Sequence, residues 1–158
     1  MLHLIPAPLH RLLYRIADRL RRQWWKVRRP VRHSVLVCAF DSNDRVLLVR
    51  HSYGPAVWAL PGGGIGRHES PDMAAEREFG EELGSGLSGL HELTDITEPD
   101  SGSMDRLHVF VARVAGSPRA DRREIVAAEF FGPDRLPHPL DRRAARWIAE
   151  ATAFLQQG

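Results

Sequence analysis

Apolar residues near the start of the chain recur at the spacing of one helix face, and basic residues occupy the other faces. The apolar positions are Leu9, Leu12, Leu13, Ile16, Leu20, Trp24 and Val27. The basic positions between them include Arg11, Arg15, Arg19, Arg22 and Lys26. This pattern predicts an amphipathic basic helix over residues 9–29 that ends before Pro30, since proline disfavours a helical conformation in the residue before it.

Beyond residue 32, short apolar runs bounded by turn residues predict a series of β-strands. The expected strands cover residues 33–40, 45–50, 87–96, 107–114 and 124–131. The turn residues 41–44 join the first two strands into a hairpin, and residues 61–64 form a second turn. The polar segment 97–104 is expected to be a loop on a mobile rim of the molecule.

Two further segments have the caps or the periodicity of helices. For residues 71–83, Ser70 is the expected N-cap, Pro71 the first helical residue and Gly84 the residue that ends the helix. Residues 140–155 have an amphipathic pattern. Strands and helices in this order predict an α/β (α+β) fold in which helices cover a mixed β-sheet.

The charges divide the chain into a basic arm, residues 1–32, and an acidic body, residues 33–158, which we expect to be a single domain. The arm carries nine arginine and lysine residues and one acid, whereas the body carries thirteen basic and nineteen acidic residues. The net charge of +2 therefore combines a strongly basic segment with an acidic one. The acidic body does not indicate a general nucleic-acid-binding surface on the domain.

Three interpretations of the arm remain open. In the first, its apolar stripe packs on the domain or on a second protomer in a homodimer. In the second, the helix lies on a membrane surface, where Trp24, Trp25 and the arginines suit an anionic lipid interface. In the third, which is the least favoured, the helix contacts nucleic acid. No apolar run approaches the about 20 residues that span a bilayer, and arginines interrupt any secretory signal. We therefore expect a cytoplasmic protein, peripheral to the membrane if the arm binds lipid.

Three glutamates in the helix predicted over residues 71–83 form a carboxylate cluster. Glu78, Glu81 and Glu82 have the i, i+3, i+4 spacing that places side chains on one face of a helix. Their negative charges repel one another, and a divalent cation would turn this repulsion into attraction. Mg²⁺ takes oxygen ligands and commonly sits between carboxylates and substrate phosphates. The cluster therefore predicts a metal site for phosphate chemistry.

Residues 58–85 resemble the signature of the Nudix hydrolase family, G-x5-E-x7-R-E-U-x-E-E-x-G-U, where U is an apolar residue. The matching positions are Gly63, Glu69, Arg77, Glu78, Phe79, Glu81, Glu82 and Gly84, with Leu83 at the unrestricted position before Gly84. Ser85 departs from the signature, because an aliphatic residue is usual there, and this change affects packing more than chemistry. The flanking segments 58–63 and 124–137 also resemble the family, so the similarity extends over residues 33–137 and leaves out the arm.

The resemblance implies a mixed, partly barrel-like sheet between helices, and hydrolysis of a nucleoside diphosphate linked to another moiety with the help of Mg²⁺ or Mn²⁺. The implied metal ligands are Glu78, Glu81, Glu82 and the carbonyl oxygen of Gly62. Glu82, followed by Glu124, is the candidate for the general base, which family members take from the signature or from a later loop. Arg77 is expected to orient the carboxylates by pairing with Glu81 or Glu69.

The residues that would bind the rest of a small-molecule nucleotide substrate are less well defined. Arg50 and Arg67 are candidates for phosphate contacts, and Tyr53 and Trp58 for stacking on a base, each with ordinary surface or core packing as an equal alternative. ADP-ribose or a nucleotide sugar is slightly favoured, because Pro99 lies within one residue of a proline common in ADP-ribose hydrolases. The rivals are a non-catalytic nucleotide-sensing domain, and a membrane-surface or partner-binding module that acts through the arm.

Overall fold

The computed structural model describes residues 9, 12–14, 16–17, 20, 31–100 and 102–157. The helices and strands in this part of the chain are β1 (Val31–Phe40), β2 (Val46–His51), β3 (Gly62–Gly64), α2 (Pro71–Leu83), β4 (Gly86–Asp100), β5 (Ser103–Ala115), β6 (Ile125–Phe131) and α3 (Ala144–Gln156). Within these residues the strands form one mixed sheet in the order β4-β5-β1-β2-β6, and β3 pairs with β1 outside this order. The predicted α+β architecture is confirmed.

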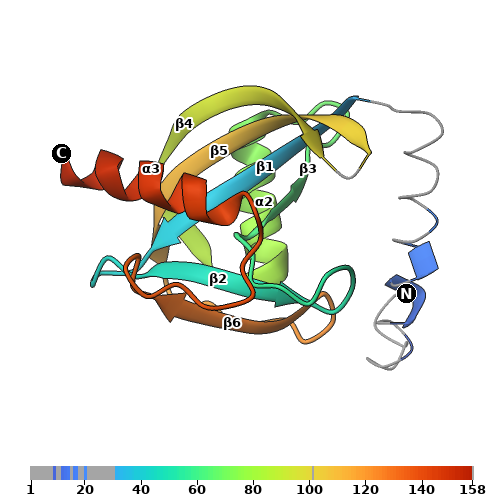
Figure 1. The fold of residues 1–158 in the computed structure, drawn as a ribbon, viewed down its shortest axis with the longest axis horizontal. Helices are drawn as coiled ribbons and strands as arrows, with labels where there is room; N and C mark the ends of the chain where they lie inside the picture. Colours follow the sequence, from blue (N-terminus) through green and yellow to red (C-terminus); the bar gives the residue numbers. More distant parts are fainter. Residues whose placement is uncertain are drawn as a thin grey trace.

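The sheet opens between β1 and β2. β1 runs parallel to β5 over its whole length, from Val31 opposite Met104 to Phe40 opposite Arg113. By contrast, β1 and β2 pair only at Phe40 and Val46, next to the turn that joins them, and then diverge (Figure 1). The short strand β3 pairs antiparallel with residues 34–36 of β1 on the side that β2 leaves. This divergence leaves room for a cavity in the middle of the fold.

Two hydrophobic clusters lie on the two faces of the sheet, because successive side chains of a strand point to opposite sides. Val35, Val37 and Ala39 of β1 belong to the cluster that contains the buried face of α2. Cys38 and Phe40 belong to the other cluster, which contains Ala144, Trp147, Ile148 and Ala151 of α3. The two helices therefore cover opposite faces of the sheet, with α3 in front and α2 behind in Figure 1.

The helix α2 begins and ends where the sequence predicts. Ser70 has the extended conformation of an N-cap residue, and Pro71 is the first residue of the helix. Gly84 has the left-handed conformation (φ 59°) and donates its N–H to the carbonyl oxygen of Gly80 at 2.9 Å. This conformation favours glycine and is a common helix end.

Two predictions of irregular structure are wrong. Residues 97–100 and 103–104 do not lie in a loop, because β4 continues to Asp100 and β5 begins at Ser103. The polar side chains of this hairpin instead find partners across the fold, where Arg32 and Arg143 form ion pairs with Asp100. Nor are residues 61–64 only a turn, because Gly62–Gly64 form β3. The last helix starts at Ala144 rather than at residue 140, since Leu140 bridges to Trp58.

Within the arm, residues 9, 12–14, 16–17 and 20 are helical, as the periodicity predicts, whereas Val31 and Arg32 already belong to β1. Leu9, Leu12, Leu13, Ile16 and Leu20 are 47–63 % exposed, so these side chains do not pack in the core of the domain. The predicted roles of Trp24 and Trp25 and the end of the helix before Pro30 lie outside the described residues. No helix in the part of the chain that the structure describes is long and apolar enough to cross a membrane. Contact with a second protomer or a lipid surface stays a prediction.

Candidate active site

The helix α2 presents two glutamates, one turn apart, to a cavity of about 630 Å³. Glu78 and Glu82 both line this cavity, together with Gly62, Gly63 and Glu124, which lies much later in the sequence. Glu82 is only 4 % exposed, and its Oε2 accepts a hydrogen bond from the Gly62 N–H at 3.3 Å. The i, i+4 spacing inferred from the sequence thus places both carboxylates at the same cavity.

Glu81 differs from its two neighbours in the predicted cluster. Its side chain is 64 % exposed and does not line the cavity. Successive residues of an α-helix are about 100° apart around its axis, so Glu81 projects to a different side from Glu82. The structure therefore brings together Glu78, Glu82 and Gly62 of the four predicted metal ligands and leaves Glu81 at the surface.

The glycines of β3 allow its backbone to approach both β1 and the carboxylates. Gly62 has a φ of 151°, and a Cβ atom there would lie 2.1 Å from the carbonyl oxygen of Val35. At Gly63 a Cβ atom would lie 2.4 Å from the carboxyl carbon of Glu78. A side chain at Gly62 would therefore clash with the backbone of β1, whereas a side chain at Gly63 would force the Glu78 carboxylate to move.

Arg77 joins three parts of the site through its guanidinium group. It donates to both carboxylate oxygens of Glu69, at 2.7 and 2.8 Å, and to Glu78 Oε1 at 2.7 Å. It also donates to the carbonyl oxygen of Gly64 at 3.0 Å and to Glu81 at 3.3 Å. The predicted pairing with Glu69 and Glu81 is present, and the contacts with Glu78 and Gly64 are additional. Arg77 thus fixes the orientation of the Glu78 carboxylate relative to β3.

The electrostatics of this pair of glutamates favour a bound cation. Burial raises the pKa of the Glu82 carboxyl well above its ordinary value, and the negative charge of Glu78 adds to this rise. Burial also raises the pKa of Glu78, although the hydrogen bond from Arg77 opposes the shift. A positive ion near both groups would stabilise their charged forms. The two carboxylates would therefore be more stable in their charged forms with a divalent cation bound between them than without one.

The donor atoms also fit a hard cation such as Mg²⁺, because they are carboxylate and backbone oxygens. Among the described residues, no group of three or more histidine, cysteine, aspartate or glutamate side chains is arranged to hold an ion by itself. This arrangement is compatible with Mg²⁺, which is usually bound by one or two carboxylates, waters and substrate phosphates. Phosphate oxygens in the cavity would complete such a site.

Glu124 reaches the same cavity from the turn before β6. The carboxylate of Asp121 accepts hydrogen bonds from the backbone N–H groups of Arg123, Glu124 and Ile125, which holds this turn in place. Tyr14 of the arm contacts Glu124, and burial together with this hydrogen bond raises the pKa of the Tyr14 phenol to about 12. Glu124 thus lines the same cavity as Glu78 and Glu82, although more than forty residues separate it from them along the chain.

Of the four residues predicted to bind substrate, only Tyr53 lines the cavity. Trp58 is buried in the core, where its ring packs edge-on against Phe131 at 5.0 Å. The guanidinium group of Arg50 lies over the Trp58 ring at 5.7 Å, and Arg67 is exposed on the surface. The structure therefore places Trp58, Arg50 and Arg67 away from the cavity wall, and the stacking role of Tyr53 stays a prediction.

The sequence analysis missed a second group of charged residues that line the cavity. They are Arg32, Asp100, Asp105, Asp141 and Arg143. These residues come from β1, from the β4–β5 hairpin and from the segment before α3, so no local motif contains them. One signal was present at Asp105, since it alternates with the buried Leu107 and Val109 and therefore occupies an inward-facing strand position.

A family model described as NUDIX domain matches residues 30–151. A diphosphoinositol polyphosphate phosphohydrolase 3-alpha of Mus musculus is 41 % identical over 75 residues, which cover 47 % of this chain and 44 % of that protein. An ADP-ribose pyrophosphatase of Mycobacterium tuberculosis is 33 % identical over 98 residues, covering 58 % and 47 %. These matches span about half the length of the curated relatives.

Among solved structures, a MutT NUDIX hydrolase from Burkholderia pseudomallei superposes with a TM-score of 0.70 at 27 % sequence identity. The superposition covers 77 % of this chain and 98 % of that one.

Proposed function

Because the chain belongs to the NUDIX domain family, we propose that it is a metal-dependent pyrophosphohydrolase that cleaves a nucleoside diphosphate linked to another moiety. The observation that carries the proposal is the position of Glu78, Glu82 and Glu124, which all line one cavity of about 630 Å³. Cavities of this size accommodate small organic ligands. Carboxylates with raised pKa values in a cavity, such as the buried Glu82 and the half-buried Glu78, are a common feature of catalytic sites.

In this proposal, Glu78, Glu82 and the carbonyl oxygen of Gly62 hold Mg²⁺ or Mn²⁺. The ion would neutralise charge on the phosphate oxygens and make a bound water a better nucleophile. Arg77 keeps the Glu78 carboxylate in position through its contacts with Glu69 and Gly64. The Gly62 N–H holds one oxygen of Glu82 in the same way.

We assign proton transfer to Glu124. Glu82 has the deep burial of a ligand, whereas Glu124 is partly exposed at the cavity and reaches it from a separate turn. A water molecule attacks one phosphorus atom and gives its proton to Glu124, while the bond from that phosphorus to the bridging oxygen breaks. The bridging oxygen leaves on the second phosphate, so each product ends in a phosphate group.

Among possible substrates, we propose ADP-ribose or a nucleotide sugar. A relative of this chain is named ADP-ribose pyrophosphatase, which supports this choice. The sequence position of Pro99 points in the same direction.

The test is hydrolysis of a panel of nucleoside diphosphate derivatives with Mg²⁺ and Mn²⁺, with both products identified by mass spectrometry. We expect turnover that a chelator abolishes and that Glu82→Gln lowers by about 10² to 10⁴-fold. Glu76→Gln is the matched control, because Glu76 is an exposed glutamate of the same helix outside the cavity. Full activity of Glu82→Gln would refute the site, and binding of nucleotides without any turnover would favour a non-catalytic sensor.

A further inference from the structure

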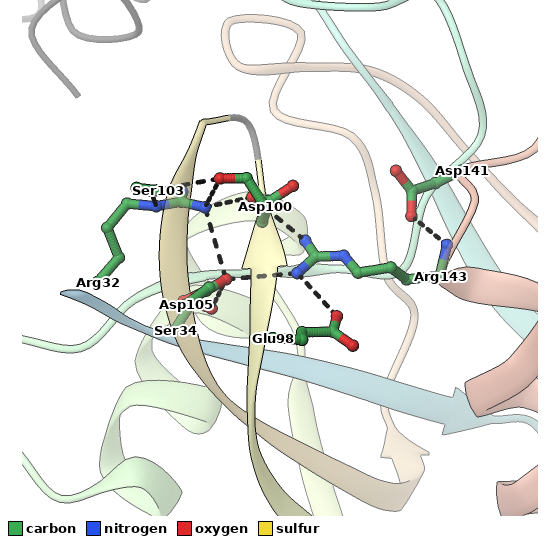
Figure 2. A network of polar contacts seen from close by, with 8 residues as sticks. All are labelled: Arg32, Ser34, Glu98, Asp100, Ser103, Asp105, Asp141 and Arg143. Carbon is green, nitrogen blue, oxygen red and sulfur yellow. Dashed lines mark hydrogen bonds and ion pairs between the residues drawn. The ribbon is translucent and has the colours of Figure 1, made fainter. Parts of the chain in front are cut away.

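Five charged residues form a compact group at the cavity, which we call the Asp105 cluster: Arg32, Glu98, Asp100, Asp105 and Arg143. In Figure 2, Arg32 and Arg143 approach Asp100 and Asp105 from opposite sides. All members except Glu98 line the same cavity as the signature glutamates. The cluster therefore faces whatever part of a substrate extends away from the diphosphate.

Asp105 is the most deeply buried member of the cluster. The residue is 0 % exposed. Its Oδ2 accepts hydrogen bonds from Ser34 Oγ at 2.7 Å and from Arg143 Nη1 at 3.3 Å. Its Oδ1 is also buried, yet it has no hydrogen-bond partner among the described residues. A buried carboxylate oxygen without a donor is costly, so a donor supplied from the cavity would stabilise it.

The two arginines of the cluster are already engaged by acids. Arg32 donates to the carboxylate of Asp100 and to Ser103 Oγ, and its Nη2 lies 3.7 Å from Asp105 Oδ2. Arg143 Nη1 lies 3.5 Å from Glu98 Oε1 in addition to its contact with Asp105. The positive charges are therefore directed toward the acids of the cluster.

The charge balance of this region is negative. Glu98, Asp100 and Asp105 outnumber the two arginines, and the carboxylate of Asp141 also lines the cavity and caps the backbone of Arg143 at 2.9 Å. A polyanionic group placed here would be repelled by the acids and would have to compete with them for the arginines. A group with O–H or N–H donors and no charge would instead find acceptors in the carboxylates of Asp100, Asp105 and Asp141.

We propose that Asp105 is a specificity-determining residue, and that its cluster binds the uncharged, donor-bearing part of the substrate while it rejects polyanionic substrates. The substrate group that donates to Asp105 is either a sugar hydroxyl or an N–H group of a nucleobase, since both are uncharged hydrogen-bond donors. This inference rests on the proposed function for the position of the diphosphate at Glu78 and Glu82. It favours nucleotide sugars and related compounds over diphosphorylated inositol polyphosphates.

Steady-state kinetics with Asp105→Asn test the proposal. The change keeps the size of the side chain but weakens its acceptor, so we expect KM for ADP-ribose to rise about tenfold while kcat changes less than threefold. For wild-type protein, kcat/KM for a diphosphoinositol pentakisphosphate should be at least a hundredfold lower than kcat/KM for ADP-ribose. Asp95→Asn is the matched control, since Asp95 is an exposed carboxylate paired with Arg106 and does not line the cavity.

Comparison of substrates identifies the source of the donor. If the rise in KM of Asp105→Asn differs between ADP-glucose and UDP-glucose, the cluster contacts the base; if it differs between ADP-glucose and ADP-ribose, it contacts the sugar. An unchanged KM for every substrate, or a wild-type preference for the inositol compound, would overturn the proposal. Thermal unfolding will show whether Asp105→Asn folds. If it does not, Asp105→Glu is the second variant, and KM should also rise because its carboxylate oxygens are displaced.

A binding measurement separates this inference from the proposed catalysis. Saturation-transfer NMR without metal should detect binding of adenosine, guanosine or ribose to wild-type protein and loss of that binding in Asp105→Asn. Inositol hexakisphosphate should show no competition with these uncharged probes. If no diphosphate is hydrolysed but these results hold, the proposed function fails and the uncharged-group site stands; absence of any Asp105-dependent binding would refute the site.

Discussion

The ring of Tyr14 stacks on the ring of Tyr53, with centroids 5.6 Å apart and planes inclined by 25°. Tyr14 belongs to the arm, outside the residues 30–151 that match the family model, whereas Tyr53 follows β2 within them. Both residues line the cavity. The stack therefore brings a side chain of the arm to the wall of the candidate active site.

We predict that Tyr14→Ala raises KM for the substrate about two- to tenfold, because an aromatic pair contributes about 0.5–1.5 kcal/mol beyond its buried area. The variant also removes the hydroxyl group that contacts Glu124. Tyr14→Phe separates the two effects, since it keeps the ring and loses only the hydroxyl group. Leu12→Ala, at an exposed position of the same helix, is the control. Equal kinetics of Tyr14→Ala and Leu12→Ala would show that the stack has no functional role.

A methyl group at Gly63 should disturb the position of Glu78. In Gly63→Ala the added Cβ would lie 2.4–2.6 Å from three atoms of the Glu78 carboxylate, so that carboxylate must move. We expect kcat/KM to fall at least tenfold and the concentration of Mg²⁺ needed for half-maximal activity to rise. The comparison is Gly64→Ala, where no atom lies within 4 Å of the added Cβ. A smaller loss in Gly63→Ala than in Gly64→Ala would contradict this arrangement.

Replacing Arg77 by lysine keeps the positive charge and removes the forked donor. Lysine cannot donate to both oxygens of Glu69 and to Glu78 at once, so Arg77→Lys should release the Glu78 carboxylate. We expect kcat to fall by about ten- to a hundredfold with a smaller change in thermal stability. Arg106→Lys changes an exposed arginine that binds Asp95 in the same two-fold manner and should retain activity. Comparable kcat values for Arg77→Lys and wild-type protein would show that charge alone suffices.

The ion pair of Glu69 with Arg77 predicts a pH dependence of stability. The hydrogen bond from Arg77 lowers the pKa of Glu69 from 4.5 to about 2. Since the folded pKa lies below the unfolded one, the stabilisation is complete above pH 4.5 and is lost as pH falls toward 2. Urea unfolding at pH 7 and pH 3 should show a larger loss of stability for wild-type protein than for Glu69→Gln. An equal loss of unfolding free energy in both proteins would exclude Glu69 as the origin of the pH dependence.

Local patterns sufficed for the elements whose stabilising contacts are local. The helix α2 was predictable from Ser70, Pro71 and Gly84, because caps act on the residues next to them. The i, i+4 spacing of Glu78 and Glu82 likewise fixed their common position at the cavity once the helix was assigned. These parts of the fold and site depend little on what lies elsewhere in the chain.

The errors arose where distant residues decide the structure. The segment 97–104 looks like a loop because its charges interrupt the apolar alternation, but the partners that stabilise Asp100 as part of a strand are Arg32 and Arg143. Nothing in the local sequence reveals these pairings. Trp58 was similarly ambiguous, because an aromatic residue beside a glycine-rich segment suits stacking on a base as well as packing against Phe131.

The parallel pairing of β1 with β5 has a consequence for the order in which the protein folds. The two strands are separated along the chain by β2, β3, α2 and β4, and pairing between segments so far apart is slow because a long loop must first close. During synthesis, every residue of the signature leaves the ribosome before β5 does. A chain that stopped after Ser85 would thus contain the whole signature and still lack β5, the strand that pairs with β1 along its whole length, while β1 in turn pairs with β3.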